Sequence, residues 1–82
     1  MNITTVKIDG MMCSMCEAHI CETIRRAFPD ARKVKASRVR GEATFVTEEP
    51  ADAVKLEKAI TETGYRFISA ETAAYKKRGL FG

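Results

Sequence analysis

The stretch TTVKIDGMMCSMCEAHICETIRRAF, residues 4–28, changes its hydrophobic spacing partway along, and that change decides the fold. Residues 4–9 alternate between apolar and polar, with Val6 and Ile8 on one side, which predicts a half-buried strand. Residues 15–28 repeat apolar side chains at the spacing of a helix, and these are Ile20, Ile24, Ala27 and Phe28. The residues between the two segments are therefore predicted to form a loop that joins a strand to an amphipathic helix.

The two ends of this helix carry signals of their own. Ser14 suits the N-cap position, and Glu17 follows three residues later as the partner in a capping box. Pro29 ends the helix, because proline lacks the backbone N–H that a further turn would need. We therefore predict a loop over residues 10–14 and a helix over residues 15–28.

The remaining residues predict a hairpin, a second helix and a last strand. Gly41 marks the turn of the hairpin. The second helix is expected to run from Pro50 to about Thr63, with Gly64 as its C-terminal cap. The further strands are expected at residues 31–39, 42–47 and 65–70.

This order, βαββαβ, predicts an α+β fold of the ferredoxin-like type, which is a four-stranded antiparallel sheet with two helices on one face. The domain is expected to span residues 1–71. Residues 72–82 are basic and are expected to form a flexible C-terminal tail. A chain of 82 residues makes one domain with a thin core, so its chemistry is expected near the surface.

The cysteines indicate a reducing compartment. There are three, an odd number, and all lie between residues 13 and 21, which does not fit a secreted disulfide scaffold. The first ten residues lack the features of a signal peptide, and no apolar run is long enough for a transmembrane segment. We therefore expect a cytoplasmic protein whose thiols do metal or redox work.

The positive charge is concentrated in residues 25–40. The net charge is +3, and seven of the fourteen basic residues lie in this segment: Arg25, Arg26, Arg32, Lys33, Lys35, Arg38 and Arg40. Such a segment favours an acidic protein surface as partner, or is a solvated basic face without one. The aromatic residues are few and do not alternate with the basic ones, so no nucleic-acid partner is expected.

Cys13 and Cys16 carry the chemistry. The first lies in the predicted loop and the second in the opening turn of the helix, so both sulfurs can be directed at one point. Thiolates select Cu(I), Zn(II) or Hg(II)-like ions over hard cations, and the free N–H groups at a helix start favour the thiolate. A closed zinc site within one chain would need a second pair of ligands, which this sequence lacks.

The motif Met11-x-Cys13-x-x-Cys16, placed after Gly10 in a βαββαβ chain, resembles the heavy-metal-associated domain family. That family includes copper chaperones and the N-terminal metal-binding domains of copper-transporting P-type ATPases. The resemblance covers about residues 4–71.

The resemblance implies roles for particular residues. It makes Cys13 and Cys16 the metal ligands and Met11 a buried anchor of the loop. The run Glu62-Thr63-Gly64-Tyr65 is similar to the end of the family's second helix, which implies that Tyr65 shields the site.

These observations predict a carrier and not an enzyme. We expect one Cu(I) per monomer, passed by thiolate ligand exchange to a metal-transporting P-type ATPase or a similar metal-binding domain. The carrier would act as a monomer, or as a dimer bridged by the metal. Two alternatives stay open: a thiol–disulfide redox protein that uses the same cysteine pair, and a sensor or adaptor for another soft ion such as Zn, Cd or Hg.

Other potential ligands lie near the pair. His19 is one turn beyond Cys16 and is either a further ligand or a solvent-facing residue, and we favour the second. Cys21 should point away from the pair, because five residues correspond to about 140° around a helix. Met12 and Met15 are expected to pack at the loop surface, although a thioether can also bind Cu(I) weakly.

Overall fold

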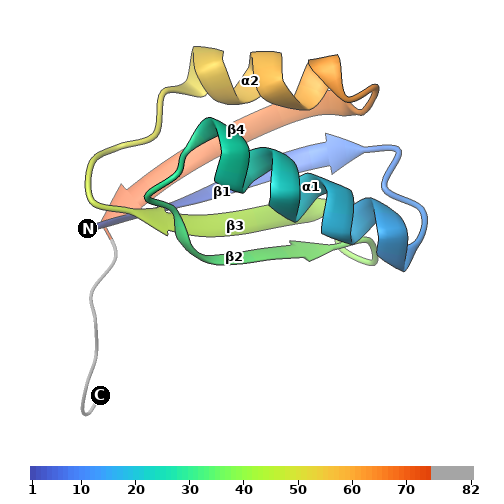
Figure 1. Ribbon diagram of the computed structural model, residues 1–82, viewed down its shortest axis with the longest axis horizontal. Helices are drawn as coiled ribbons and strands as arrows, with labels where there is room; N and C mark the ends of the chain where they lie inside the picture. The colour runs from blue at the N-terminus through green and yellow to red at the C-terminus, as the bar shows by residue number, and fades with distance from the viewer. Residues whose placement is uncertain (75–82) are drawn as a thin grey trace, which may run out of the picture.

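The computed structural model describes residues 1–74 and contains the six predicted elements in the predicted order. They are β1 (Asn2–Asp9), α1 (Ser14–Ala27), β2 (Arg32–Ser37), β3 (Glu42–Thr47), α2 (Ala53–Glu62) and β4 (Arg66–Ala74). The four strands form one sheet in the order β2-β3-β1-β4, and every neighbouring pair is antiparallel. Both helices lie on one face of this sheet (Figure 1). The ferredoxin-like fold class is therefore confirmed.

The core lies between the sheet and the two helices. Val6 and Ile8 of β1 are buried, as their alternation predicted, and Phe45 of β3 lies beside them in the same cluster. The Phe45 ring stacks on Phe28 with 5.4 Å between centroids. The helices contribute residues four apart along each buried face, and these are Ile20, Ile24, Leu56 and Ile60. Neither described helix combines the length and the apolar content that crossing a membrane would require.

The predicted capping box at the start of α1 is wrong. The N-cap residue is Cys13 and not Ser14, and its side chain makes no capping hydrogen bond. Glu17 does not reach back to the helix start, because its carboxylate accepts hydrogen bonds from Arg38 in the turn between β2 and β3. A tertiary contact with a backbone N–H and a guanidinium has replaced the local one.

The second helix also begins later than predicted, at Ala53 and not at Pro50. The Asp52 carboxylate accepts hydrogen bonds from the backbone N–H groups of Val54 at 3.0 Å and Lys55 at 3.4 Å. Asp52 is therefore the N-cap, because its side chain satisfies two donors that the first turn leaves free.

The last strand continues four residues beyond its predicted end, to Ala74. Residues 72–74 pair with the first residues of β1, and the hydroxyls of Thr4 and Thr72 lie 3.0 Å apart. These three residues of the expected tail are thus paired in the sheet, because β1 itself starts at Asn2 and offers them partners. The rest of that expected tail, residues 75–82, lies outside the described residues, and the domain boundary at residue 71 stays a prediction.

One end of the molecule gathers three connections. The loop from β1 to α1, the turn from β2 to β3 and the turn from α2 to β4 all lie there (Figure 1). The backbone N–H of Ile8 donates to the Gly41 carbonyl at 2.8 Å, which joins the end of β1 to the hairpin turn. The fold therefore places the segment with the cysteines among residues that are distant in sequence.

Replacing a core residue of α2 tests whether this small core stabilises the domain without metal. Leu56 is fully buried, so Leu56→Ala is expected to lower the free energy of unfolding by about 3 kcal/mol. Urea denaturation of the reduced, metal-free protein measures this. Val54→Ala is the control on the same helix, because Val54 is 73% exposed and the change should stay within about 0.5 kcal/mol. Equal losses for the two variants, or no cooperative transition without metal, would contradict the described core.

Candidate metal centre

The loop between β1 and α1 depends on Gly10 and Met11. Gly10 has a φ of +102°, a backbone conformation that glycine adopts without steric cost. A Cβ atom at this position would lie 3.6 Å from Cδ1 of Tyr65, so the chain passes close to that ring. The Met11 side chain is only 6% exposed and belongs to the core cluster. Its predicted burial is confirmed, and it ties the loop to the interior.

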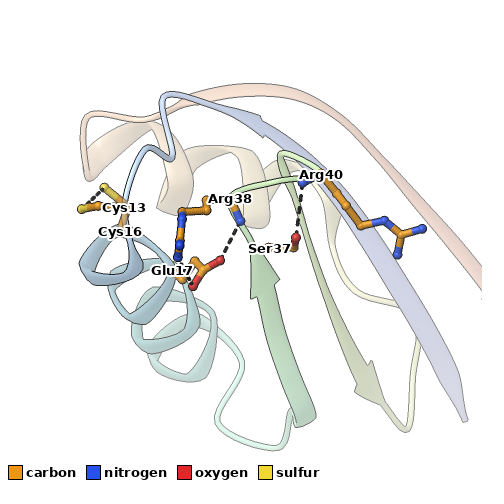
Figure 2. Close-up of polar contacts among 6 residues, drawn as sticks. All are labelled: Cys13, Cys16, Glu17, Ser37, Arg38 and Arg40. Carbon is orange, nitrogen blue, oxygen red and sulfur yellow. Dashed lines mark hydrogen bonds and ion pairs between the residues drawn. The ribbon is translucent and has the colours of Figure 1, made fainter.

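The two cysteines that the motif singled out lie side by side at the end of this loop. Their Sγ atoms are 3.5 Å apart (Figure 2), and both thiols are free. Cys13 is exposed, whereas Cys16 is half-buried against the core. The Cys13 carbonyl accepts from the backbone N–H groups of Cys16 at 3.0 Å and Glu17 at 3.2 Å, which holds the first turn of α1. One ion can therefore contact both sulfurs with little movement of the loop.

Tyr65 acts on the half-buried thiol. Hydrogen bonds lower the pKa of Cys16 from 9.0 to about 7. The largest contribution comes from the Tyr65 side chain, smaller ones come from the backbone of Met12 and Cys13 and from the Cys13 thiol, and burial opposes the shift. The contact with Cys16 raises the pKa of Tyr65 to about 12, because its proton stabilises the thiolate. The lowered pKa favours the thiolate of Cys16 near neutral pH, and the thiolate is the form that binds soft metals.

Cys21 does not join the pair. It lies on the side of α1 that faces β2, where its thiol is within 3.9 Å of the Val34 carbonyl oxygen. Burial raises the pKa of the Cys21 thiol above 9.0, the nearby Glu17 raises it too, and Arg25 opposes the shift. Cys21 is therefore a half-buried, protonated thiol at neutral pH.

His19 lies on the exposed side of α1. It lines a shallow surface hollow of about 330 Å³, together with Met15, Ala18, Glu22 and Arg25. Within residues 1–74, His, Cys, Asp and Glu side chains nowhere form a group of three or more that could hold a metal. The loop thus offers two closely placed thiols and no cluster of harder ligands around them.

The β2–β3 turn contacts the first turn of α1, which no pattern in the sequence predicts. The Glu17 carboxylate accepts from the backbone N–H of Arg38 at 2.7 Å and from its guanidinium at 3.4 Å (Figure 2). The two residues are 21 positions apart, and no local spacing rule connects them. Glu17 and Arg38 come together only when β2 and β3 pair in the folded sheet.

The structure also divides the basic segment. Arg25 and Arg26 lie in the last turn of α1, whereas Arg38 and Arg40 lie in the hairpin turn, at the end of the molecule that carries the cysteines. A hollow of about 490 Å³ separates this turn from the loop, and it is lined by Asp9, Gly10, Met11, Met12, Arg38 and Val39. Arg38 therefore lies beside the loop, whereas the Arg40 side chain extends away from the cysteines and lies 3.9 Å from Glu42 (Figure 2).

Apolar side chains are exposed around the same pair. Met12 is 84% exposed, Met15 is 77% exposed, and Val39 on the hairpin turn is 88% exposed. Their exposure agrees with the surface position expected for the two methionines. Exposed apolar side chains beside charged ones are typical of a surface that contacts another protein.

The chain matches the family model of the heavy-metal-associated domain over residues 5–66. A search of curated proteins gives no match.

Several solved structures share the fold. A copper binding domain from HMA7, a P-type ATPase, has a TM-score of 0.70 at 19% identity, covering 90% of this chain and 96% of its own. The CopZ metallochaperone has a TM-score of 0.69 at 16% identity and coverages of 80% and 98%. Oxidized MerP from Ralstonia metallidurans CH34 has a TM-score of 0.68 at 24% identity and coverages of 83% and 96%.

Removing the Tyr65 hydroxyl tests the electrostatics of the pair. Tyr65→Phe is expected to raise the pKa of Cys16 from about 7 toward 9.0, because the thiolate loses its largest stabilising contact. The thiolate fraction of Cys16 at pH 7 should fall accordingly. The ¹³Cβ chemical shift of Cys16, followed from about pH 5 to about pH 10, measures the midpoint. Cys21 serves as the internal reference and should titrate as before. An unchanged Cys16 midpoint would mean that Tyr65 does not set this pKa.

Proposed function

Because this chain belongs to the heavy-metal-associated domain family, we propose that it binds one Cu(I) between Cys13 and Cys16 and passes it to a partner protein. The observation that carries the proposal is the 3.5 Å separation of two free thiols at a surface loop. The lowered pKa of Cys16 supports it, since a thiolate is ready for the ion at neutral pH. In such a transfer the protein carries the ion to its partner and catalyses no reaction.

The ligand set favours Cu(I) over Zn(II). Zinc in proteins takes four ligands, and residues 1–74 hold no group of three or more His, Cys, Asp and Glu side chains placed for a metal. Two thiolates suit the near-linear coordination of Cu(I), which prefers soft ligands. His19 lines a separate hollow on α1, so we propose that it is not a ligand.

Transfer is proposed to proceed by exchange of thiolates. A thiolate of the partner attacks the ion beside Cys13, which is the more exposed of the two cysteines. The ion then has three sulfur ligands, and the sulfurs of this chain leave in turn as further partner ligands bind. The copper stays Cu(I) throughout, so no oxidant or reductant takes part. An ion held by only two ligands at the surface is accessible to such an attack.

The partner is proposed to be an acidic metal-binding domain, such as that of a metal-transporting P-type ATPase, that docks transiently in the cytoplasm. Arg38 and Arg40 supply positive charge at the hairpin turn, and Met12 and Val39 supply apolar contact area. Complementary charge mainly accelerates the encounter, whereas apolar contacts orient the two sites. The surface around the thiols therefore matches what a brief ligand exchange requires.

A thiol–disulfide redox role is the second candidate, because sulfurs 3.5 Å apart with one lowered pKa also favour disulfide formation. A dithiol oxidoreductase would need only the pair and an electron acceptor. The two functions differ in whether the protein holds Cu(I) tightly under reducing conditions.

Serine variants of the pair test the metal site. Cys13→Ser and Cys16→Ser are each expected to weaken Cu(I) binding by at least about a hundredfold, because a hydroxyl is a poor ligand for a soft ion. Anaerobic competition with a chromophoric Cu(I) chelator measures this. Cys21→Ala is the matched control and should change affinity less than about twofold, because that thiol lies against β2. Wild-type affinity in the double serine variant would refute the site.

A charge reversal tests the docking surface. Arg40→Glu is expected to slow Cu(I) transfer to an acidic ATPase metal-binding domain by about threefold at low salt, and less at high salt. Stopped-flow measurement of the transfer rate at two ionic strengths gives the result. Arg26→Glu makes the same charge change in the last turn of α1, at the opposite end of that helix, and should have a smaller effect. Equal slowing by both variants would favour a general effect of net charge over docking at the hairpin turn.

A further inference from the structure

We infer that the contact between Glu17 and Arg38 is a brace that positions the thiol pair and slows the loss of its ion. The inference rests on the proposed function, since it concerns the same site. Glu17 follows Cys16 directly in the first turn of α1, so any movement of this turn carries the Cys16 sulfur with it. The contact joins that turn to the hairpin between β2 and β3 (Figure 2).

The first turn of α1 depends on this contact because it lacks the usual side-chain cap. Its N-cap residue, Cys13, makes no capping hydrogen bond with its side chain. A helix start without a capping side chain leaves backbone N–H groups without local partners, and such ends fray. Two sets of hydrogen bonds hold this turn. The Cys13 carbonyl accepts from backbone N–H groups within the turn, and the Glu17 carboxylate accepts from Arg38 in the hairpin turn.

The two parts of the contact differ in strength. The bond from the backbone N–H of Arg38 to Glu17 is 2.7 Å long, and a charged acceptor makes such bonds stronger than neutral ones. The guanidinium bond is 3.4 Å long, and the two side chains are 45% and 26% exposed, so solvent weakens this ion pair. Most of the effect is therefore expected from the backbone bond, which a variant of Arg38 leaves in place.

The hairpin turn, which forms the other half of the brace, is stabilised by its own hydrogen bonds. The backbone N–H of Gly41 donates to the Ser37 carbonyl at 2.9 Å, and that of Arg40 donates to the Ser37 hydroxyl at 3.2 Å. The Gly41 carbonyl in turn accepts from Ile8 near the end of β1. One turn thus holds both arms of the metal loop, β1 through Gly41 and α1 through Glu17.

This arrangement has a consequence for ligand exchange. As a partner thiolate binds the ion, one sulfur of this chain must withdraw, and the loop or the first helical turn must shift to allow it. A brace on both arms opposes that shift while keeping the sulfurs at the distance that an ion needs. Loosening one arm should therefore speed release and reduce the preorganisation of the pair.

A graded set of variants tests the brace. Glu17→Ala removes both bonds and is expected to speed release of Cu(I) to an excess of chelator by about fivefold. Glu17→Gln keeps an oxygen that can accept from the Arg38 backbone, and Arg38→Ala keeps that backbone bond itself, so each should change the rate by about twofold. Glu22→Ala is the control, because it removes an exposed acid from the same helix and should leave the rate unchanged. Circular dichroism verifies that helix content is retained.

A measurement without metal separates the brace from ordinary loss of stability. In the equilibrium with glutathione, the two thiols become one disulfide while oxidised glutathione is reduced to two thiols. Loosening the pair lowers the effective concentration of one sulfur at the other. Glu17→Ala should shift this equilibrium toward the dithiol by about fivefold, and Glu17→Gln should recover most of the wild-type value.

The outcomes are distinct. If Glu17→Ala matches the wild-type protein within twofold in both the release rate and the thiol equilibrium, the brace is refuted, whatever the cysteines bind. If the wild-type protein and the double serine variant Cys13→Ser, Cys16→Ser bind Cu(I) equally, the proposed function fails instead, and the thiol equilibrium alone decides on the brace. Recovery in Glu17→Gln with loss in Glu17→Ala supports the inference.

Discussion

The pairing of β1 on both of its edges is the constraint on which the rest of the structure depends. This strand lies between β3 and β4, and its inward side chains Val6 and Ile8 are buried in the core. A central strand has its register set from two sides, and a slip of one residue would turn its apolar side chains to the other face. The end of β1 is thereby fixed in space, and the cysteine loop begins there.

The site next to the end of β1 is formed by contacts between the loops and turns at this end of the molecule, and not by a deep cavity. The hairpin turn reaches the end of β1 through Gly41 and the start of α1 through Arg38, while Tyr65 approaches from the turn between α2 and β4. A domain with so small a core has little room to enclose a ligand. It instead presents two sulfurs at the surface and positions them by hydrogen bonds, which suits the proposed transfer of an ion to a partner.

The electrostatics of the loop follow from the same arrangement. An acid next to the thiols, such as Glu17, would by itself disfavour a thiolate, but its carboxylate is engaged by Arg38. The Tyr65 hydroxyl and backbone groups then lower the pKa of Cys16. Cys21 lies on the side of α1 that faces β2, and burial raises its pKa. Thiols of one short segment therefore differ in chemistry because the fold surrounds them differently.

Much of this protein was determined by its sequence alone. The alternation of Val6 and Ile8, the helical spacing of Ile20 and Ile24, and the order of elements are local patterns, and each was confirmed as part of the fold. The placement of Cys13 and Cys16 at a loop and a helix start follows from the same patterns. Tertiary structure decided the rest: the N-cap at Cys13, the extension of β4 to Ala74 and the partner of Glu17. These depend on residues that sheet pairing brings together across long separations, where a stronger distant partner displaces the local one.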